Sequence, residues 1–324
     1  MPAVLVTGGH GFLGSYVVRD LAARGATVVI LDVTSPSVAL QKRLAPYGEQ
    51  IEFVQGSITN RAWVKEVVQE HDVGQIVHAA ALCDAEALLT QPYCAFEVNT
   101  LGTVNLLDAA QDLPGRFVHI SSIAVYQSKR YEPLDEAHPI FDPRRGHPAG
   151  PYGASKAAAE MMGQSYAEEA GVDYIALRVA AIYGFGMNIP LYLKPLLTHA
   201  LAGEPYTLEG GPGRKRNFTY VKDAVSAVCS ALDAPGAQLR QRAFTIAEGR
   251  LYSPEEVADL VRKVIPGATI EVRPGTALSD EARRRMEHYG ELDLSAAREQ
   301  LGFEPRYPLE AGLRDYVEEC RRME

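Results

Sequence analysis

Cysteine and histidine are sparse in this chain, and neither is arranged to hold a metal ion. The 324 residues include four cysteines, at positions 83, 94, 229 and 320, and eight histidines that show no paired spacing. Metal sites and disulfide frameworks need such residues at short, regular spacings. We therefore expect no metal, and scattered thiols of this kind are typical of a reducing cytoplasm.

Long apolar runs and an excess of positive charge are also missing. No segment approaches the roughly 20 apolar residues that a membrane-spanning helix needs. The first apolar strand begins by residue 4, which leaves no room for an export signal. The net charge of −9 disfavours a nucleic-acid partner, because such partners bind a basic face. We expect a cytoplasmic location and neither a membrane nor a nucleic-acid partner.

Glycine, by contrast, is present where it matters, near the start of the chain. Residues 4–14 read VLVTGGHGFLG, so a short apolar run leads into glycines and a helix-like segment follows. Gly8 permits a tight turn, Gly11 lets the backbone approach a phosphate, and Gly14 lets the helix pack on the strand. The pattern predicts a strand, a turn and a helix N-terminus that hold a dinucleotide pyrophosphate. A glycine-rich turn without a ligand is the alternative.

Asp32 extends this motif. It ends a second apolar run, residues 27–31, eighteen residues after Gly14. An acidic side chain at this place binds both ribose hydroxyls and repels a 2′-phosphate, which favours NAD over NADP. The alternative for Asp32 is a simple turn residue at the end of a strand.

Strand-like and helix-like segments alternate through the first half of the chain, which predicts an α/β fold with a doubly wound parallel sheet. The expected strands are residues 3–7, 27–31, 51–54, 75–79, 116–120 and 174–178, and the expected helices are 12–24, 60–70, 100–112 and 153–170. After residue 178 the pattern loosens and returns only briefly. We therefore predict a Rossmann NAD-binding domain of residues 1–178 plus 218–247, and a smaller, discontinuous substrate-binding domain of residues 179–217 plus 248–324.

Tyr152 and Lys156 place a phenol and an ammonium four residues apart, on one face of an expected helix. An unperturbed tyrosine has a pKa near 10, too high for a base at neutral pH, but a nearby lysine charge favours the tyrosinate. The pair follows Val118–Ser122, a strand that ends in hydroxyls at the carboxyl edge of the sheet, where open α/β sheets bind ligands. This position favours catalysis over a solvated helix face.

Together these residues resemble the extended short-chain dehydrogenase/reductase family, in its nucleotide-sugar epimerase and dehydratase branch, which is UDP-glucose 4-epimerase-like. The resemblance covers nearly the full length. It is carried by Thr7–Gly14, His78–Ala81, Asn99, Ser121–Tyr126, Tyr152 with Lys156, Leu177–Arg178, Ile182–Gly184, Arg216–Asp223 and Leu301–Pro305. Several ordered motifs are more specific than any one of them.

The resemblance implies a catalytic set of three residues. Tyr152 takes a proton from a sugar hydroxyl while hydride passes to the nicotinamide, and Ser122 hydrogen-bonds the same oxygen. Lys156 binds the nicotinamide ribose and lowers the pKa of Tyr152. The residues implied to contact NAD are Gly8, Gly11, Phe12, Leu13, Asp32, Ser57, Ile58, Ala79, Ala80, Ala81, Asn99, Tyr152 and Lys156. Ser57 stands where an aspartate that contacts adenine is usual, which weakens one contact.

Substrate contacts are implied for Ser122 and Tyr152 and for two arginines. Arg216 and Arg273 lie where related epimerases bind a substrate diphosphate, a task that suits the paired donors of a guanidinium group. The alternative is that both are surface arginines in loops. The segment 144–147, with two further arginines and a histidine, offers substrate contacts or is a solvated basic loop.

Several positions depart from the family pattern. Ile123 and Ala124 occupy the places of the acidic pair with which the family's dehydratases eliminate water, so dehydration is not expected. Ala181 and Leu191–Tyr192 stand where such epimerases tend to have asparagines, and Thr276 replaces a typical aspartate. These departures put a standard UDP-hexose pocket in doubt.

Three functional hypotheses remain open. The first is an epimerase that retains NAD and acts on a nucleotide sugar, and the second is a dehydrogenase of a sugar, sugar acid or related polyol with net NADH release. The retained arginines favour the first and the lost asparagines the second. The third is a dinucleotide sensor or scaffold without activity, which does not need an intact Ser122, Tyr152 and Lys156. The resemblance also implies a homodimer in which helices 100–112 and 153–170 pair with their copies.

Overall fold

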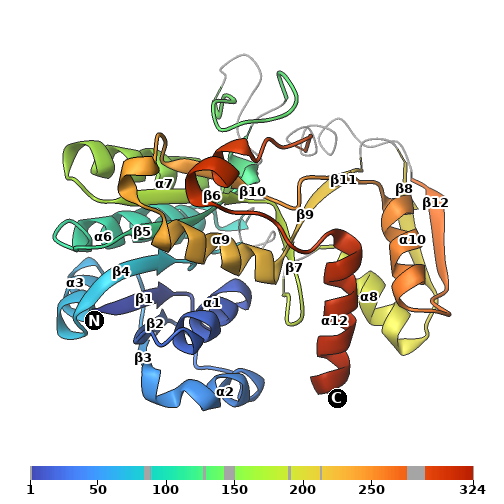
Figure 1. Ribbon diagram of the computed structural model, residues 1–324, viewed down its shortest axis with the longest axis horizontal. Coiled ribbons are helices and arrows are strands. Elements are labelled where there is room, and N and C mark those ends of the chain that lie inside the picture. Colours follow the sequence, from blue (N-terminus) through green and yellow to red (C-terminus); the bar gives the residue numbers. More distant parts are fainter. Residues whose placement is uncertain are drawn as a thin grey trace.

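The computed structural model describes residues 2–83, 88, 90–126, 129–141, 150–188, 191–211, 214–275 and 289–323. Its centre is a parallel sheet of seven strands in the order β10-β6-β5-β4-β1-β2-β3 (Figure 1). The strands are β1 (Ala3–Thr7), β2 (Val28–Asp32), β3 (Ile51–Gln55), β4 (Val73–His78), β5 (Phe117–Ser122), β6 (Tyr174–Val179) and β10 (Ala243–Ile246). The predicted α/β class with a doubly wound parallel sheet is confirmed.

All six expected strands form within two residues of their predicted bounds, but β10 was not expected. Its four residues, AFTI, are too few to show a period in a part of the chain where the strand and helix pattern has loosened. The helix expected over 100–112 is also divided. A π-helical turn, η2 (Glu97–Leu101), leads into α6 (Gly102–Ala109).

Helices cover both faces of the sheet, because its strands are apolar on both sides. In β1, Val4 and Val6 belong to the same core cluster as α1 and α9, whereas Ala3 and Leu5 belong to the cluster of α3 and α6. The helices of this part are α1 (Phe12–Ala23), α2 (Val38–Leu44), α3 (Arg61–Glu70), α5 (Pro92–Phe96), α6, α7 (Gly150–Glu169) and α9 (Val221–Asp233), with short 3₁₀ turns η1 (Ala45–Gln50), η3 (Ile123–Val125) and η4 (Gly236–Gln238).

The remaining elements form a smaller unit beside the carboxyl edge of the sheet, at the right of Figure 1. A three-stranded sheet has the order β11-β9-β7, and β12 pairs with β8. These strands are β7 (Ala181–Tyr183), β8 (Tyr206–Gly210), β9 (Arg216–Tyr220), β11 (Leu251–Tyr252) and β12 (Ile270–Pro274), and the helices are α8 (Leu193–Ala202), α10 (Pro254–Val264) and α12 (Leu309–Met323). The π-helical turn η5 (Ala297–Leu301) instead packs against α9 and β10 of the large sheet. Helix α10 starts at the capping box that Ser253 and Glu256 form, as its sequence indicates.

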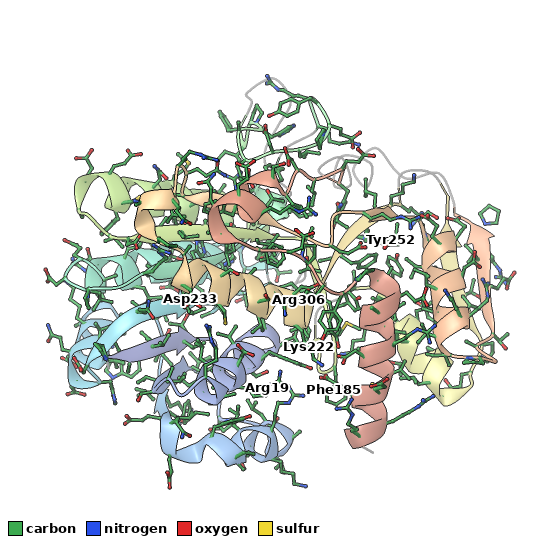
Figure 2. All side chains as sticks on the ribbon, viewed as in Figure 1. Arg19, Phe185, Lys222, Asp233, Tyr252 and Arg306 are labelled. Carbon is green, nitrogen blue, oxygen red and sulfur yellow. The ribbon has the colours of Figure 1, made fainter. Side chains whose placement is uncertain are left out.

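The C-terminal helix α12 contacts α9, a helix that packs on the large sheet, through the side chain of Lys222. This side chain, in the first turn of α9, forms ion pairs with Asp315 at 2.6 Å and Glu319 at 3.0 Å on α12 (Figure 2). Strand β10 pairs in the seven-stranded sheet and α9 packs on that sheet, while β9 pairs in the smaller sheet. We propose the domain division predicted above, with the chain crossing between the two units along β9.

Candidate active site

A cavity of about 460 Å³ lies at the carboxyl edge of the large sheet, where β1, β4, β5 and β6 end. Ligands of open α/β sheets bind at this edge. The lining residues come from all four strand ends, from α7 and from the smaller unit: Gly11, Phe12, Leu13, Ala79, Ala81, Cys83, Ile120, Ser121, Ser122, Ile123, Ala124, Tyr152, Lys156, Val179, Ala180, Ala181, Ile182, Asn188 and Tyr289. The predicted catalytic residues therefore share one cavity with the glycine turn.

The glycine turn between β1 and α1 has the geometry that its sequence predicts. Gly8 has a φ of 68°, and a Cβ atom there would lie 2.8 Å from the backbone nitrogen of Ala80. A Cβ atom on Gly14 would collide with the carbonyl oxygen of Gly8, so the helix packs directly on the turn. Gly11 is the N-cap of α1, and none of the described side chains caps this helix or places an acid in its first turn. The helix N-terminus thus suits the pyrophosphate of NAD.

Asp32 lies beside this turn, at the end of β2. One carboxylate oxygen accepts from the backbone N–H of His10 at 3.0 Å, and the other accepts from the N–H and the hydroxyl of Thr34, both at 2.9 Å. A carboxylate has about four acceptor sites. Asp32 is therefore oriented by its neighbours and keeps acceptor capacity for a ribose hydroxyl, although the ribose contact itself stays a prediction.

Ser57 and Ile58 follow β3 and do not line the described cavity. The Ser57 hydroxyl lies 2.8 Å from that of Thr59, within its own turn. Ile58 is buried, and its carbonyl oxygen accepts from the Asn105 amide at 2.9 Å. Their predicted contacts with the adenine end of the cofactor remain predictions.

Of the three alanines after β4, two line the cavity and one supports the glycine turn. Ala79 and Ala81 line the cavity. Ala80 instead lies against Gly8, and its N–H donates to the Thr7 hydroxyl at 3.3 Å. The alanines are small enough to let the glycine turn and this segment approach each other closely.

Asn99 has a supporting place rather than a place in the cavity wall. Its side chain is fully buried, and its Oδ1 accepts from the N–H of Leu82 at 2.7 Å. Its Nδ2 donates to the Leu82 carbonyl at 2.9 Å and to the Ser155 hydroxyl at 3.0 Å. The structure thus gives Asn99 the role of joining the loop after β4 to α7, and does not bring it to the cavity for the NAD contact that the resemblance implies.

Ser122 and Tyr152 meet in the cavity. Ser122 ends β5, its hydroxyl accepts from the N–H of Ala124 at 3.1 Å, and it also hydrogen-bonds the Tyr152 phenol. Burial raises the pKa of Tyr152 above its usual value, the Cys83 thiol raises it further, and the bond with Ser122 lowers it. The lowering of this pKa by Lys156 that the resemblance implies is not among these influences.

Lys156 is 1% exposed, and its ammonium is directed into the protein. It donates to the Ile120 carbonyl at 2.8 Å and lies 3.4 Å from Nε2 of His119. Because an ammonium has no acceptor, that nitrogen accepts, so Nδ1 of His119 carries the proton and donates to the Tyr174 hydroxyl at 2.9 Å. Burial lowers the pKa of Lys156 to about 8, against the opposite effect of Cys83 and Glu160.

The two arginines predicted to bind substrate lie in different places. Arg216, on β9, donates to the Tyr289 hydroxyl at 2.5 Å and its guanidinium lies 4.8 Å from the centre of that ring, which lines the cavity. Arg273, on β12, has a side chain that is 62% exposed and pairs with Glu271 at 2.7 Å. The structure therefore brings Arg216 behind the cavity wall and does not bring Arg273 to it.

Five lining residues were not singled out from the sequence: Cys83, Val179, Ala180, Asn188 and Tyr289. Val179 and Ala180 directly follow the strand expected over 174–178. Cys83 follows Ala81 in the segment after β4, and continuing that segment by two residues would have found it. Asn188 and Tyr289 lie in irregular connections, where no motif marks them. Residues 144–147 and Thr276, which were also considered for the substrate side, lie outside the described residues.

Comparison with known proteins gives the family. The model of the NAD dependent epimerase/dehydratase family matches residues 4–247. The chain belongs to this family. It is an enzyme of the family with NAD as its cofactor, and the predicted resemblance to the epimerase and dehydratase branch of the extended short-chain dehydrogenases/reductases is confirmed. The glycine turn and the uncapped N-terminus of α1 fit that cofactor.

Named relatives of this enzyme have different activities. A protein of Methanocaldococcus jannaschii provisionally named a UDP-glucose 4-epimerase is 28% identical over 323 residues, which are 97% of each chain. The dTDP-glucose 4,6-dehydratase of Streptomyces niveus is 30% identical over 97% of this chain and 91% of its own.

Solved structures similar to this chain also belong to enzymes with different activities. The UDP-glucose 4-epimerase of Thermotoga maritima with UDP-glucose matches 99% of both chains with a TM-score of 0.82 and 26% identity. The L-threonine dehydrogenase of Phytophthora infestans covers 99% of this chain and 100% of its own, with a TM-score of 0.82 and 25% identity. The family and fold are shared, and the reaction differs among its members.

The described ranges hold neither a metal-binding cluster nor a membrane-spanning helix. Among the described residues, no three His, Cys, Asp or Glu side chains gather as metal ligands. In the same part of the chain, no helix has both the length and the apolar character to cross a membrane.

Proposed function

We propose that this enzyme is a nucleotide-sugar epimerase that retains NAD and transfers hydride transiently. The observation that carries the proposal is the convergence of Ser122, Tyr152 and Lys156 on the cavity that the glycine turn also lines. NAD, when bound, supplies the hydride acceptor. The UDP-glucose 4-epimerase of T. maritima, with which the chain shares its fold over nearly its whole length, supports the choice of a nucleotide sugar.

The three residues have separate tasks in this proposal. Tyr152 takes the proton of a substrate hydroxyl, and Ser122, which hydrogen-bonds the phenol, binds the same substrate oxygen. Lys156 lines the cavity with its ammonium held by the Ile120 carbonyl, and the proposal assigns it to the nicotinamide ribose. Tyr152 must lose its proton to act, and burial opposes that loss. The hydrogen bond with Ser122, which lowers the pKa of Tyr152, favours that loss.

Dehydration has little support in the cavity, although one named relative is a dehydratase. Ile123 and Ala124 line the cavity next to Ser122. Neither side chain can donate or accept a proton. An elimination of water needs a second acid and base at the reacting carbon, and these two positions do not supply them.

A net dehydrogenase of a sugar, sugar acid or related polyol is the second candidate. Ala181 lines the cavity, and Leu191 is buried, where epimerases of the family tend to have amide side chains. The likeness to an L-threonine dehydrogenase over the full chain supports a reaction in which hydride is not returned.

The decisive experiment incubates the purified protein with a panel of UDP-, GDP- and dTDP-sugars and follows NADH and epimer exchange together. Epimer exchange without accumulation of NADH supports the epimerase. NADH formed in proportion to substrate consumed overturns it in favour of the dehydrogenase. A dehydrated product would contradict both candidates.

We also propose a homodimer in the cytoplasm, without a nucleic-acid partner. Large apolar side chains are exposed on α5 and η2 and on α7: Tyr93, Phe96, Leu101, Met161 and Met162. Exposed apolar groups on packed neighbouring helices suit a partner surface. Sedimentation as a monomer at micromolar concentration would contradict the dimer, and Met161→Glu is expected to shift the protein toward the monomer.

A further inference from the structure

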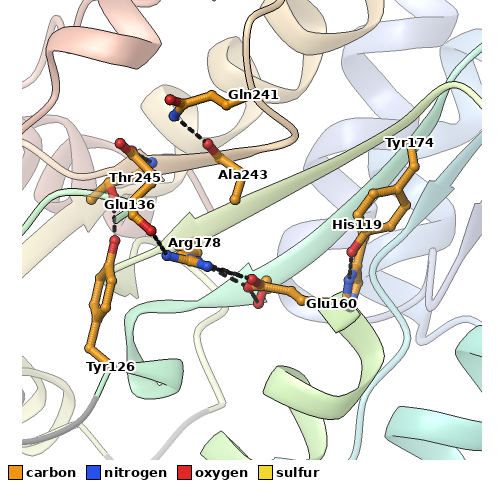
Figure 3. A network of polar contacts seen from close by, with 10 residues as sticks. His119, Tyr126, Glu136, Glu160, Tyr174, Arg178, Gln241, Ala243 and Thr245 are labelled. Atoms are coloured by element: carbon orange, nitrogen blue, oxygen red, sulfur yellow. Dashed lines mark hydrogen bonds and ion pairs between the residues drawn. The ribbon is translucent and has the colours of Figure 1, made fainter. Parts of the chain in front are cut away.

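A buried ion pair lies beside the catalytic set. Glu160 on α7 and Arg178 on β6 are each 6% exposed. The guanidinium donates to one carboxylate oxygen of Glu160 through Nη2 at 2.9 Å and Nε at 3.0 Å (Figure 3). A buried pair of this kind needs all its donors and acceptors satisfied, because leaving one charge unpaired is strongly destabilising.

The same carboxylate contacts a third element. The Ser121 hydroxyl, on β5, donates to Oε1 of Glu160. Ser121 directly precedes Ser122, and Glu160 lies one helical turn after Lys156 on α7. One side chain therefore joins the strand that carries Ser122 and the helix that carries Lys156 to β6, whose end forms another wall of the cavity.

The far side of Arg178 is also satisfied. Its Nη1 donates to the Glu136 carbonyl at 3.1 Å, and its guanidinium lies 5.1 Å from the centre of the Tyr126 ring. The Glu136 carboxylate accepts from the N–H of Thr245 at 2.6 Å, and the Thr245 and Tyr126 hydroxyls lie 2.8 Å apart (Figure 3). Arg178 thus has partners on both sides and is not among the residues that line the cavity.

The Glu160–Arg178 pair also lies among the charges that act on Lys156. Cys83 from the loop after β4, Glu160 on α7, and His78 and His119 on β4 and β5 interact with Lys156 directly. The titratable groups beside these are Arg178 and Tyr174 on β6, which bond Glu160 and His119. Tyr152 lies one helical turn before Lys156 on α7. Burial keeps the pKa of His78 and of His119 well below the usual value, so both rings are neutral. Glu160 raises the pKa of Lys156, as does Cys83.

We propose that Glu160 is a positioning residue for the catalytic set. Through Ser121 it holds Ser122 at the end of β5, and its negative charge, one helical turn away, favours the ammonium form of Lys156. Arg178 supports it by holding the carboxylate through two hydrogen bonds within a buried ion pair. The catalytic meaning of this inference rests on the proposed function, whereas the electrostatic link between Glu160 and Lys156 can be measured without any substrate.

The first test measures the titration of Lys156 in the full-length protein labelled with [ε-¹³C]lysine, with the resonance assigned by its loss in Lys156→Arg. Glu160→Gln keeps the size of the side chain and removes its charge, so the pKa of Lys156 is expected to fall by about one pH unit. The matched control is Glu169→Gln, which removes the same charge from an exposed position of the same helix and is expected to leave the midpoint within about 0.2 pH unit. An equal midpoint in wild type and Glu160→Gln overturns the electrostatic part.

The second test separates position from charge. Ser121→Ala keeps the ion pair and removes only the link to β5, so the Lys156 midpoint and the affinity for NAD are expected to stay unchanged. With a sugar that the wild type turns over, kcat is expected to fall about tenfold at unchanged KM, because Ser122 loses its support. Wild-type kcat in Ser121→Ala overturns the positioning part.

These two arms also distinguish failure of the inference from failure of the proposed function. If no sugar of the panel reacts, the proposed function fails, but the lysine titration still decides whether Glu160 acts on Lys156. If Glu160→Gln does not fold, Ser121→Ala carries the test of positioning. In that case Glu160→Gln is combined with Arg178→Gln, so that no buried charge is left unpaired, and the Lys156 midpoint is still expected to fall, because Glu160 and not Arg178 acts on Lys156. An unchanged midpoint would overturn the electrostatic part.

Discussion

The two walls of the cavity are built in different ways. On the sheet side, Ser122, Tyr152 and Lys156 are carried by regular elements, and each has a hydrogen-bonding partner in the described structure. On the substrate side, Asn188 and Tyr289 come from irregular connections of the smaller unit. In the proposed enzyme, regular elements of the fold therefore hold the catalytic groups, while irregular connections form the side of the cavity assigned to the substrate.

Two ion pairs, one buried and one exposed, differ in how much their loss would lower the free energy of unfolding. Arg178 and Glu160 are buried in the sheet-side wall, whereas Arg273 and Glu271 form a pair of similar length on the surface of β12. A buried pair is costly to break because a charge is left in a medium of low polarity. An exposed pair contributes about 0–1 kcal/mol, since water solvates either partner alone.

The largest effect is expected from Tyr152→Phe, which removes a proton acceptor from the sheet-side wall. The ring and its packing remain, so NAD binding is expected to stay nearly intact, while turnover falls by about three orders of magnitude. Single-turnover measurements with the best sugar of the panel, combined with titration of NAD by fluorescence, check both parts. Activity within tenfold of wild type would show that Tyr152 is not the base.

Lys156→Met tests how the buried lysine of the same wall makes the free energy of unfolding depend on pH. Burial lowers the pKa of Lys156 from 10.5 to about 8 in the folded protein, so the folded state binds fewer protons than the unfolded state between these values. The free energy of unfolding of the wild type therefore rises with pH from about 8 to 10.5, by up to about 3 kcal/mol from this group. Lys156→Met lacks that rise, and urea unfolding at pH 7.5, 9 and 10.5 measures the difference. Parallel pH profiles in the two proteins would contradict it.

The sheet-side wall could be predicted because its residues depend on local patterns. Gly8, Gly11 and Gly14 report a turn that only small residues allow, and Tyr152 and Lys156 lie one helical turn apart whatever surrounds them. The parallel arrangement then brings Ser122 to the same edge of the sheet. The sequence could not indicate that the Lys156 ammonium contacts His119 or that burial raises the pKa of Tyr152, because both depend on packing between distant segments.

The substrate-side wall could not be predicted for a related reason. The resemblance implies a substrate contact for Arg273, but the strand pairing of β12 with β8 carries it to the surface, and pairing is not visible in a motif. The resemblance implies an NAD contact for Asn99, whose amide is used by Leu82 and Ser155. In both cases the direction of the side chain depends on contacts that a motif does not show.

A smaller effect is expected from Asp32→Ala, at the adenosine end of the sheet-side wall. Loss of the carboxylate removes a charged hydrogen-bond acceptor for the ribose and the repulsion of a 2′-phosphate, so the ratio of kcat/KM for NAD over NADP is expected to fall about tenfold. The comparison uses a released cofactor assay or direct binding of both dinucleotides. An unchanged ratio would leave Asp32 as a support of the turn through His10 and Thr34 alone.

The smallest effects separate the two arginines of the substrate side. Arg216→Ala removes the cation behind Tyr289, and KM for a nucleotide sugar is expected to rise about fivefold to tenfold with little change in kcat. Arg273→Ala removes one exposed ion pair, and KM is expected to change less than twofold. Arg240→Ala, whose exposed partner is Glu299, is the matched surface control. An equal and large rise of KM in Arg216→Ala and Arg273→Ala would mean that β12 moves toward the cavity with substrate bound. The contrast between a fold-placed and a connection-placed wall would then describe only the free enzyme.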